Sequence, residues 1–177
     1  ALQVVLQAGV VPCTVLGGGS NVIAPDAGID GIVLSSRGLT SLAVRTGRAA
    51  PCTLDDWDAV QESCPVTLFC GSGVQVDFLA DWCARHGILG MQQFAGLPGT
   101  VGGAAWMNAR CYEQNFSDLI ATVEYLDLNA SPAATADGPA AAPYIKLDNR
   151  DWDYKKSPFQ TILPFIILSA KFTVTSG

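Results

Sequence analysis

The residues with the clearest capacity for chemistry are glycines, and they gather in three short segments. The first comprises Gly17, Gly18, Gly19, Ser20 and Asn21, the second residues 71–73, and the third residues 96–104. Glycine reaches backbone conformations that other residues avoid and lets the chain approach a ligand closely. Successive N–H groups in such turns can curl around an anion. The chemistry predicted is therefore the binding of a phosphorylated or planar ligand.

The first segment predicts a pyrophosphate cradle, with a plain tight turn as the alternative. Its glycines follow an apolar run directly, and the Ser20 hydroxyl and the Asn21 amide add hydrogen-bond donors. The Gly-Lys-Ser/Thr sequence of a Walker loop does not follow, and the spacing differs from the Rossmann fingerprint. Three glycines taken alone favour the tight turn.

The second and third segments differ in how much glycine they hold. Gly71, Ser72 and Gly73 stand between an apolar run and the clearest predicted helix, whose N-terminus attracts negative charge. Taken alone, they are better explained as an ordinary strand-to-helix turn. The third segment contains four glycines, a proline and a threonine, more than a turn needs and costly to order. It predicts backbone that lies flat against a large planar or phosphorylated ligand.

Short strands and helices are predicted around these segments. Strands are expected over residues 12–16, 22–24, 31–35, 39–45, 66–70, 122–128 and 162–174, and helices over residues 1–10, 76–86 and 104–109. The helix over 76–86 is the clearest, because its apolar residues recur at helical spacing and a glycine follows it. Those apolar residues are Phe78, Leu79, Trp82 and Cys83, and the glycine is Gly87. Residues 46–64 and 129–143 are predicted to be mainly turns and loops, and a weak boundary falls at Arg37-Gly38.

Composition and charge narrow the class of protein. Apolar residues make up 49% of the 177 residues and charged residues 15%, which predicts a sizeable folded core rather than disorder. The net charge of −6 and the lack of Lys and Arg runs argue against nucleic acid as a partner. No apolar stretch is long enough to span a membrane, and no signal peptide is visible near the first residue.

Six cysteines and one histidine offer little for metal chemistry. No C-x-x-C pair occurs and His86 stands alone, so no metal site is predicted. Several cysteines lie in apolar runs, as Cys70 does after Leu68-Phe69. They are interpreted as buried thiols in a reducing compartment, with disulfides as the less favoured alternative.

The three glycine segments, in this order, resemble the UDP-N-acetylenolpyruvoylglucosamine reductase (MurB) family. Residues 16–22 are similar to its LGGGSN segment, and residues 96–104 match its G-[IL]-P-G-T-V-G-G-A segment almost letter for letter. Further similarities are Gly87, Gly90, Met107-Asn108-Ala109, Tyr112 and residues 154–159, which resemble its Tyr-Arg-x-Ser segment. The resemblance runs from about residue 16 to residue 172.

The resemblance implies an α+β chain with the two-part FAD-binding fold of the vanillyl-alcohol oxidase (PCMH) type, a small α/β subdomain followed by a larger mixed α/β subdomain. Residues 1–37 would form the first subdomain, N-terminally incomplete, and residues 38–177 the second. The family's C-terminal substrate domain would be absent, as expected of an excised FAD-binding portion. An intact short homologue without reductase activity is the alternative.

The family's reaction implies the cofactors and the partner. FAD is the expected cofactor and NADPH the reductant, in the reduction of UDP-N-acetylglucosamine enolpyruvate to UDP-N-acetylmuramate for peptidoglycan synthesis. The partner is then a small-molecule UDP-sugar in the cytoplasm, without nucleic acid or membrane, and this chain alone would be inactive. The alternatives are a flavin oxidase of the same fold acting on another substrate, and a non-catalytic module that binds FAD or a nucleotide.

The same resemblance implies which residues bind FAD. Residues 17–21 would hold the diphosphate. The adenosine and isoalloxazine portions would lie along Ser72, Gly73, Gly99, Thr100, Gly102 and Gly103.

On the substrate side, Lys155 stands where the family has an Arg that binds the substrate carboxylate and steadies the intermediate. Lysine keeps the charge but lacks the bidentate fork. Tyr112 and Ser157 would contact the substrate, with a packed aromatic and a local turn hydroxyl as their respective alternatives. Arg110 and Glu113 replace family glycines beside Tyr112, and Gln92 stands where the family often has Glu.

Overall fold

A computed structural model describes residues 12–46, 52–53, 65–127, 144–146, 151–160 and 165–176. The helix predicted over residues 1–10, the loop predicted over 129–143 and most of 46–64 lie outside the described residues. The strands are β1 (Cys13–Leu16), β2 (Ile32–Ser35), β3 (Leu42–Thr46), β4 (Cys52–Thr53), β5 (Pro65–Gly71), β6 (Ile88–Leu89), β7 (Arg110–Cys111), β8 (Gln114–Asn115), β9 (Ile120–Asp127), β10 (Tyr144–Lys146) and β11 (Phe165–Ser176). The helices are α2 (Val76–Arg85) and α3 (Val101–Met107), with 3-10 turns η1 (Ser36–Gly38), η2 (Gln92–Phe94), η3 (Phe116–Asp118) and η5 (Pro158–Gln160).

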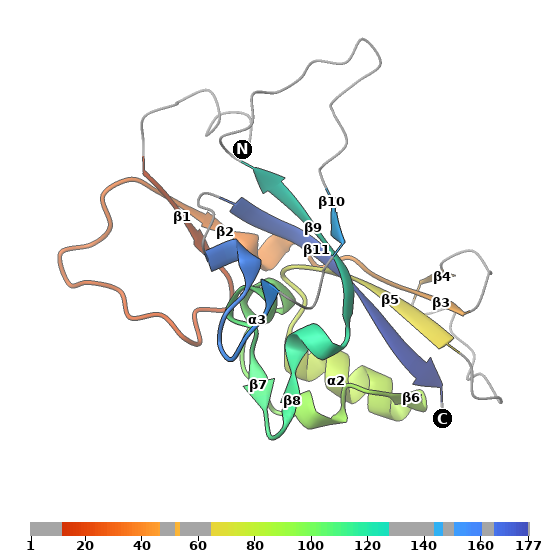
Figure 1. The fold of residues 1–177 in the computed structure, drawn as a ribbon. Helices are drawn as coiled ribbons and strands as arrows, with labels where there is room; N and C mark the ends of the chain where they lie inside the picture. Colours follow the sequence, from red (N-terminus) through yellow and green to blue (C-terminus); the bar gives the residue numbers. More distant parts are fainter. Residues whose placement is uncertain are drawn as a thin grey trace, which may run out of the picture.

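The larger of the two main sheets is built around β11, its longest strand. β11 pairs antiparallel with β5 on one side and β9 on the other, in the order β10-β9-β11-β5-β3-β4, and β6 pairs with its end. α3 packs against β11 and β5 (Figure 1). Just beyond the end of β5, the Ser72 N–H bonds to the Leu168 carbonyl of β11 at 2.9 Å. This bond fixes the beginning of the segment that follows β5.

The second sheet is small and consists of β1 and β2 paired in parallel, with Cys13 opposite Ile32 and Leu16 opposite Ser35. A long exposed connection, residues 17–31, joins these strands and projects away from the larger sheet (Figure 1). The chain changes sheet at η1. Mixed strand pairing with separate helices confirms the expected α+β class.

An aromatic stack fills the core beside α3. Phe116 lies between Phe94 and Phe172, with ring centroids 5.2 Å and 5.3 Å apart in edge-to-face geometry. All three rings are fully buried. Edge-to-face contacts add to the burial of the rings, so this stack ties η2, η3 and β11 together.

Two expected elements differ from the structure. Residues 22–24 do not form a strand: Val22 and Ile23 are exposed, Ile23 by 97%, and no strand pairs with them in the described part of the chain. Phe78 does not share the buried face of α2, because its side chain is 52% exposed. At 3.6 residues per turn Phe78 lies about 200° around the axis from the buried Val76, so the core-facing side is set by other residues. Those residues are Val76, Leu79, Ala80, Trp82 and Cys83.

The remaining boundaries shift in ways that have local causes. α3 begins at Val101 rather than Ala104, because the Thr100 side chain accepts a bond from the Gly103 N–H and caps the helix. β3 begins at Leu42 rather than Leu39. The apolar run at the C-terminal end of the sequence forms one strand, β11.

The described cysteine side chains carry free thiols. Cys70 and Cys83 are buried, and Cys13 and Cys111 are partly buried. Burial raises the pKa of the Cys70 thiol well above its usual value and that of Cys83 to about 12. The interpretation as buried thiols is confirmed for Cys70 and Cys83. Within the described residues, the helices are too short and too polar to cross a bilayer.

Replacing the central ring of the aromatic stack tests this core. Phe116→Ala should lower the free energy of unfolding by about 3–5 kcal/mol, because it removes a buried ring and leaves a cavity. Phe78→Ala, on the exposed side of α2, should lower it by less than about 1 kcal/mol. Urea denaturation of both variants measures the difference, and equal losses would contradict the stack as described.

Candidate functional site

The first and third glycine segments, about 80 residues apart in the sequence, are in direct backbone contact. We call residues 17–21 loop 1, residues 71–73 loop 2 and residues 96–104 loop 3. A Cβ placed on Gly18 would lie 2.9 Å from the Gly99 Cα, and one placed on Gly17 would lie 2.7 Å from the Thr100 Oγ1. Side chains at these two positions would push the loops apart, so glycine here is required for the close approach.

Loop 2 meets the other side of loop 3. The Gly102 N–H bonds to the Ser72 carbonyl at 2.8 Å, and the Val101 N–H bonds to the Val74 carbonyl at 2.8 Å. A Cβ on Gly102 would come within 2.7 Å of the Ser72 Cβ. Loop 3 is therefore held between loop 1 and loop 2, and the three segments form one junction.

Loop 2 is also fastened to the turn that follows the small sheet. The Gly71 N–H bonds to the Ser41 carbonyl at 2.7 Å, and the Gly73 N–H bonds to the Leu39 carbonyl at 2.8 Å. Cβ atoms on these glycines would collide with the carbonyl oxygens of Leu39 and Ser36, respectively. The junction thus lies where the small sheet, the larger sheet and α3 come together.

Loop 1 leaves its backbone donors free. None of the N–H groups of residues 17–21 donates a hydrogen bond to another described residue. The Ser20 hydroxyl, by contrast, donates to the Pro98 carbonyl at 3.1 Å, which ties loop 1 to loop 3. Gly19 has a φ of +79° and Gly99 a φ of +112°, both in the region that favours glycine. Unpaired amides along a glycine turn are the donor set for a bound anion.

Two hydroxyl groups lie inside the junction. Ser72 is fully buried, and its Oγ has no hydrogen-bond partner among the described residues. The Thr100 Oγ1 accepts from the Gly103 N–H at 3.4 Å. A buried hydroxyl without a protein partner calls for an explanation, and a ligand bound at the junction would be one. The structure therefore brings loops 1, 2 and 3 together, with Gly19 and Asn21 on the outer side of loop 1.

Lys155 lies in a tight turn beside the C-terminal end of α3. Asp153 and Lys156 exchange backbone bonds of 3.3 Å and 2.9 Å across this turn. Lys155 has a φ of +53°, unusual for a side chain of its size, and its ammonium lies 5.4 Å from the centre of the Tyr154 ring. The side chain is exposed, so its charge is available to a ligand.

Ser157 anchors this turn to α3. Its side chain is buried, and its hydroxyl donates to the Trp106 carbonyl at 2.6 Å. The next turn, η5, is held by Phe159, whose ring packs edge-on against Trp152 and Phe165. The hydroxyl proton of Ser157 is thus engaged within the protein, and its contact with a substrate stays a prediction.

Asn108 was not singled out as a site residue from the sequence, yet its amide connects both sides of this region. It ends α3 in the left-handed conformation, with a φ of +43°, and is buried. Its Nδ2 donates to the Asp153 carbonyl at 2.9 Å, and its Oδ1 accepts from the Ser117 N–H at 3.0 Å. The signal available in the sequence was an Asn beyond a helix, because Asn tolerates this conformation better than most residues.

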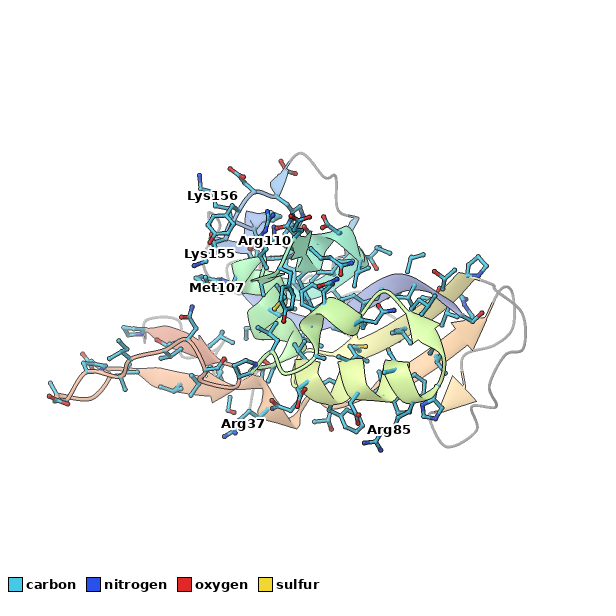
Figure 2. All side chains as sticks on the ribbon, turned by 90° about the horizontal axis from the view of Figure 1, so that it is seen from below. Arg37, Arg85, Met107, Arg110, Lys155 and Lys156 are labelled. Atoms are coloured by element: carbon cyan, nitrogen blue, oxygen red, sulfur yellow. The ribbon has the colours of Figure 1, made fainter. Side chains whose placement is uncertain are left out.

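The β7–β8 hairpin faces the Lys155 turn across a cleft of about 250 Å³. Tyr112, at the hairpin tip, has a φ of +52° and is 83% exposed, which contradicts the alternative of a packed aromatic. The Arg110 Nε donates to the Tyr112 carbonyl at 3.2 Å, which orients the guanidinium. Arg110, Lys155 and Lys156 lie on the same side of the molecule, near Met107 (Figure 2). The cleft is lined by Asn108, Arg110, Asn115, Ser117, Asp118, Trp152, Asp153 and Tyr154.

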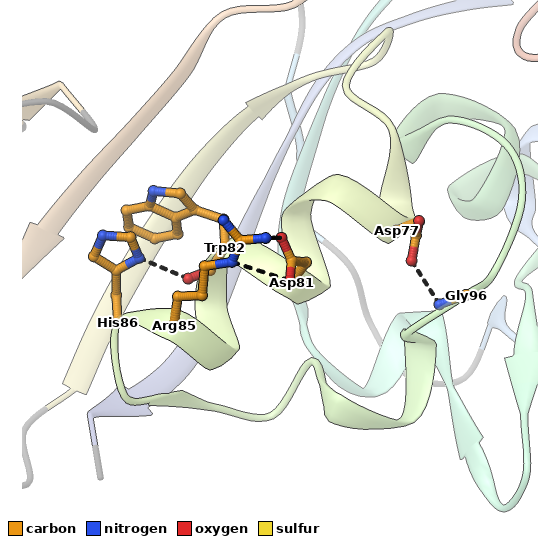
Figure 3. Close-up of polar contacts among 6 residues, drawn as sticks. All are labelled: Asp77, Asp81, Trp82, Arg85, His86 and Gly96. Carbon is orange, nitrogen blue, oxygen red and sulfur yellow. Dashed lines mark hydrogen bonds and ion pairs between the residues drawn. The ribbon is translucent and has the colours of Figure 1, made fainter.

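His86 belongs to the end of α2 and not to this junction. Its ring stacks on Trp82 with centroids 4.3 Å apart, and its Nδ1 lies 2.8 Å from the Trp82 carbonyl (Figure 3). Among the described residues, no group of three His, Cys, Asp or Glu side chains could hold a metal ion.

Comparison with known sequences identifies the kind of domain. The family described as FAD binding domain matches residues 2–131. The UDP-N-acetylenolpyruvoylglucosamine reductase of Treponema denticola is 33% identical over 175 residues, which cover 94% of this chain and 48% of that protein. The enzyme of the same name from Treponema pallidum is also 33% identical, over 85% of this chain and 45% of its own length. The chain therefore spans about half the length of these relatives.

Comparison with solved structures agrees on the fold. The UDP-N-acetylenolpyruvylglucosamine reductase of Thermus caldophilus aligns over 99% of this chain and 53% of its own, with a TM-score of 0.63 and 22% identity. Cholesterol oxidase from B. sterolicum aligns over 99% of this chain and 32% of its own, with a TM-score of 0.56 and 12% identity. These likenesses, together with the family match, confirm the expected two-part FAD-binding fold.

The amide of Asn108 can be tested by two substitutions. Asn108→Ala should lower the free energy of unfolding by about 2–4 kcal/mol, because it unpairs the Asp153 carbonyl and the Ser117 N–H and keeps an unfavourable φ. Asn108→Gly loses the same bonds but relieves the backbone, so it should be about 1 kcal/mol more stable than the alanine variant. Chemical denaturation measures both, and a wild-type stability in either would exclude the bridging role.

Proposed function

The chain belongs to the FAD binding domain family, and we propose that it is the flavin-holding part of a UDP-N-acetylenolpyruvoylglucosamine reductase. FAD is the cofactor of this domain. The observation that carries the proposal is the row of unpaired N–H groups in loop 1, which at Gly17 and Gly18 packs so closely against loop 3 that a Cβ would collide. Such donors bind phosphate without a basic side chain, which suits a chain of net charge −6.

The residues present fit FAD along the whole junction. The N–H groups of residues 17–21 would hold the diphosphate, and the bond from Ser20 to the Pro98 carbonyl keeps loop 1 against loop 3. The partnerless hydroxyl of Ser72 would gain an acceptor or donor from the bound cofactor. Along the rest of the ligand, Gly73, Gly99, Thr100, Gly102 and Gly103 would offer backbone instead of side chains.

When bound, FAD supplies hydride transfer between NADPH and substrate. For the complete protein we propose reduction of UDP-N-acetylglucosamine enolpyruvate to UDP-N-acetylmuramate. Lys155 would place one positive charge on the substrate carboxylate and stabilise the charge that develops there. Ser157 and Asn108 hold the turn that presents Lys155, and Arg110 lines the cleft next to that turn. Tyr112 lies exposed between β7 and β8 of the same hairpin.

The division into two FAD-binding subdomains, residues 1–37 and 38–177, is also a proposal. The change from the small sheet to the larger one within η1 supports a boundary at this place. A UDP-sugar substrate and the free thiols of the described cysteines support action in the cytoplasm.

A flavin oxidase acting on another substrate is the second candidate, and the likeness to cholesterol oxidase favours it at the level of fold. The higher identity to the reductases favours the first candidate. Flavin reduction by NADPH with slow reoxidation by oxygen would distinguish the reductase from an oxidase.

Loop 1 can be tested directly. Gly18→Asp places a carboxylate in the proposed diphosphate cradle and also forces loop 3 away, so it should abolish FAD binding. Gly38→Ala is the matched control, because a Cβ there meets nothing within 4 Å and should leave FAD affinity unchanged. Visible absorbance and flavin titration measure both variants. Unchanged FAD affinity in Gly18→Asp would exclude this cradle.

Lys155 can be tested in the full-length protein. Lys155→Arg should preserve or raise turnover, because arginine keeps the charge and adds a bidentate fork for a carboxylate. Lys156→Arg, on the same exposed turn, should change turnover by less than about twofold. Steady-state oxidation of NADPH with the UDP-sugar measures the rates. A large fall in Lys155→Arg alone would remove Lys155 from the carboxylate-binding role.

A further inference from the structure

We propose that Asp77 is a positioning residue for loop 3, whose carboxylate holds the start of that loop in the conformation that binds FAD; this inference rests on the proposed function. Asp77 lies in the first turn of α2, next to the point where loop 3 begins (Figure 3). Its Oδ1 accepts a hydrogen bond of 2.7 Å from the Gly96 N–H, 19 residues further along the chain. The bond is short and has a charged acceptor, the stronger class of hydrogen bond.

The backbone at Gly96 needs such a restraint. Gly96 has a φ of +77°, and a Cβ placed on it would meet nothing within 4 Å. Glycine is therefore favoured at position 96 by the backbone conformation and not by close packing. An exposed glycine loses much conformational entropy when it is ordered, so an external hydrogen bond has a large effect on which conformation it populates.

The start of α2 contacts loop 3 through two backbone contacts and through the Asp77 side chain. Gln75 forms a bridge with Thr100, and the Val76 N–H bonds to the Gly99 carbonyl at 3.0 Å. Three consecutive residues at the start of α2 therefore hold loop 3. The two backbone contacts fix its middle, and Asp77 fixes its beginning.

The same restraint reaches loop 1. Pro98 lies between Gly96 and Gly99, and its carbonyl accepts the Ser20 hydroxyl at 3.1 Å. If residue 96 is released, the segment before the Pro98 carbonyl is held by the bond from the Leu97 N–H to the Phe94 carbonyl at 3.0 Å and no longer by Asp77 as well. Ser20 would then bond to a less firmly held acceptor, and loop 1 would lose part of its alignment with loop 3.

The chain contains a matched control one turn along α2. Asp81 pairs with Arg85 at 2.7 Å on the exposed face and makes no contact with loop 3 (Figure 3). Asp77 and Asp81 are both exposed acidic residues of the same helix. Removing either takes away one surface charge, but only Asp77 holds a cofactor loop.

The experiment measures FAD affinity by flavin fluorescence titration, and thermal stability without FAD, in the full-length protein. Asp77→Ala should weaken FAD binding about five- to tenfold, while Asp81→Ala should change it by less than about twofold. Asp77→Asn keeps an oxygen acceptor for the Gly96 N–H and should bind FAD within about threefold of wild type. Both Asp77 variants lose the charge at the N-terminus of α2, and Asp77→Ala also loses the bond to Gly96, so its thermal stability without FAD should fall by more than that of Asp77→Asn.

A double variant tests the connection to loop 1. If Asp77 acts through the Pro98 carbonyl, Asp77→Ala combined with Ser20→Ala should weaken FAD binding by less than the product of the two single effects. Full additivity would overturn that route.

The outcomes separate this inference from the function on which it rests. If wild type and Asp81→Ala bind FAD and Asp77→Ala binds it equally well, the positioning role is wrong and the proposed function stands. An asparagine variant as weak as the alanine variant would also overturn the role, because it would show that the charge and not the acceptor matters. Failure of the full-length wild type to bind FAD would overturn the proposed function and the inference together.

Discussion

The approach of two glycine segments, backbone to backbone, is the constraint on which the rest of the site depends. Gly18 and Gly99 leave no room for a Cβ between them, and Gly102 is as close to Ser72. Contacts of this kind require that three distant parts of the chain be held in fixed positions, because a shift smaller than a methyl group would create a collision or a gap. The larger sheet, α2 and α3 provide those positions.

The backbone N–H groups of the junction differ in whether they have a hydrogen-bond acceptor within the protein. Most N–H groups of loops 2 and 3 bond within the protein: to each other, to the segment after the small sheet, to β11, to η2 and to Asp77. Loop 1 does not, and its amides stay free of other described residues. Gly17 and Gly18 are half-buried and residues 19–21 are exposed, so these amides are open to a ligand. A ligand with several acceptor oxygens could bond to them without a basic side chain, and an acidic chain could bind a diphosphate in this way.

The region around the Lys155 turn is held together differently. In the described part of the chain, the residues other than glycine with positive φ are Asn108, Tyr112 and Lys155. Asn108 lines the cleft, and Tyr112 and Lys155 lie in the hairpin and the turn whose residues form its walls. Each such residue is less stable than it would be in an ordinary conformation, and surrounding contacts must hold it there. The Asn108 amide and the Ser157 hydroxyl are two of those contacts. This region therefore depends on buried side-chain bonds, whereas the glycine junction depends mainly on backbone contacts.

Several features of the fold and the candidate site could be predicted from the sequence alone. The features that could not be predicted have one physical reason in common. The glycine-rich segments and the strand followed by a helix at β5 and α2 follow from local composition, and the FAD-binding character follows from resemblance. The contact of loop 1 with loop 3, the exposure of Phe78 and the bridging by Asn108 did not follow. Each depends on which face of an element meets its neighbour, and that is decided by packing between residues far apart in the chain. For the same reason Asp77 was indistinguishable from Asp81 in the sequence, and only the fold places one of them against Gly96.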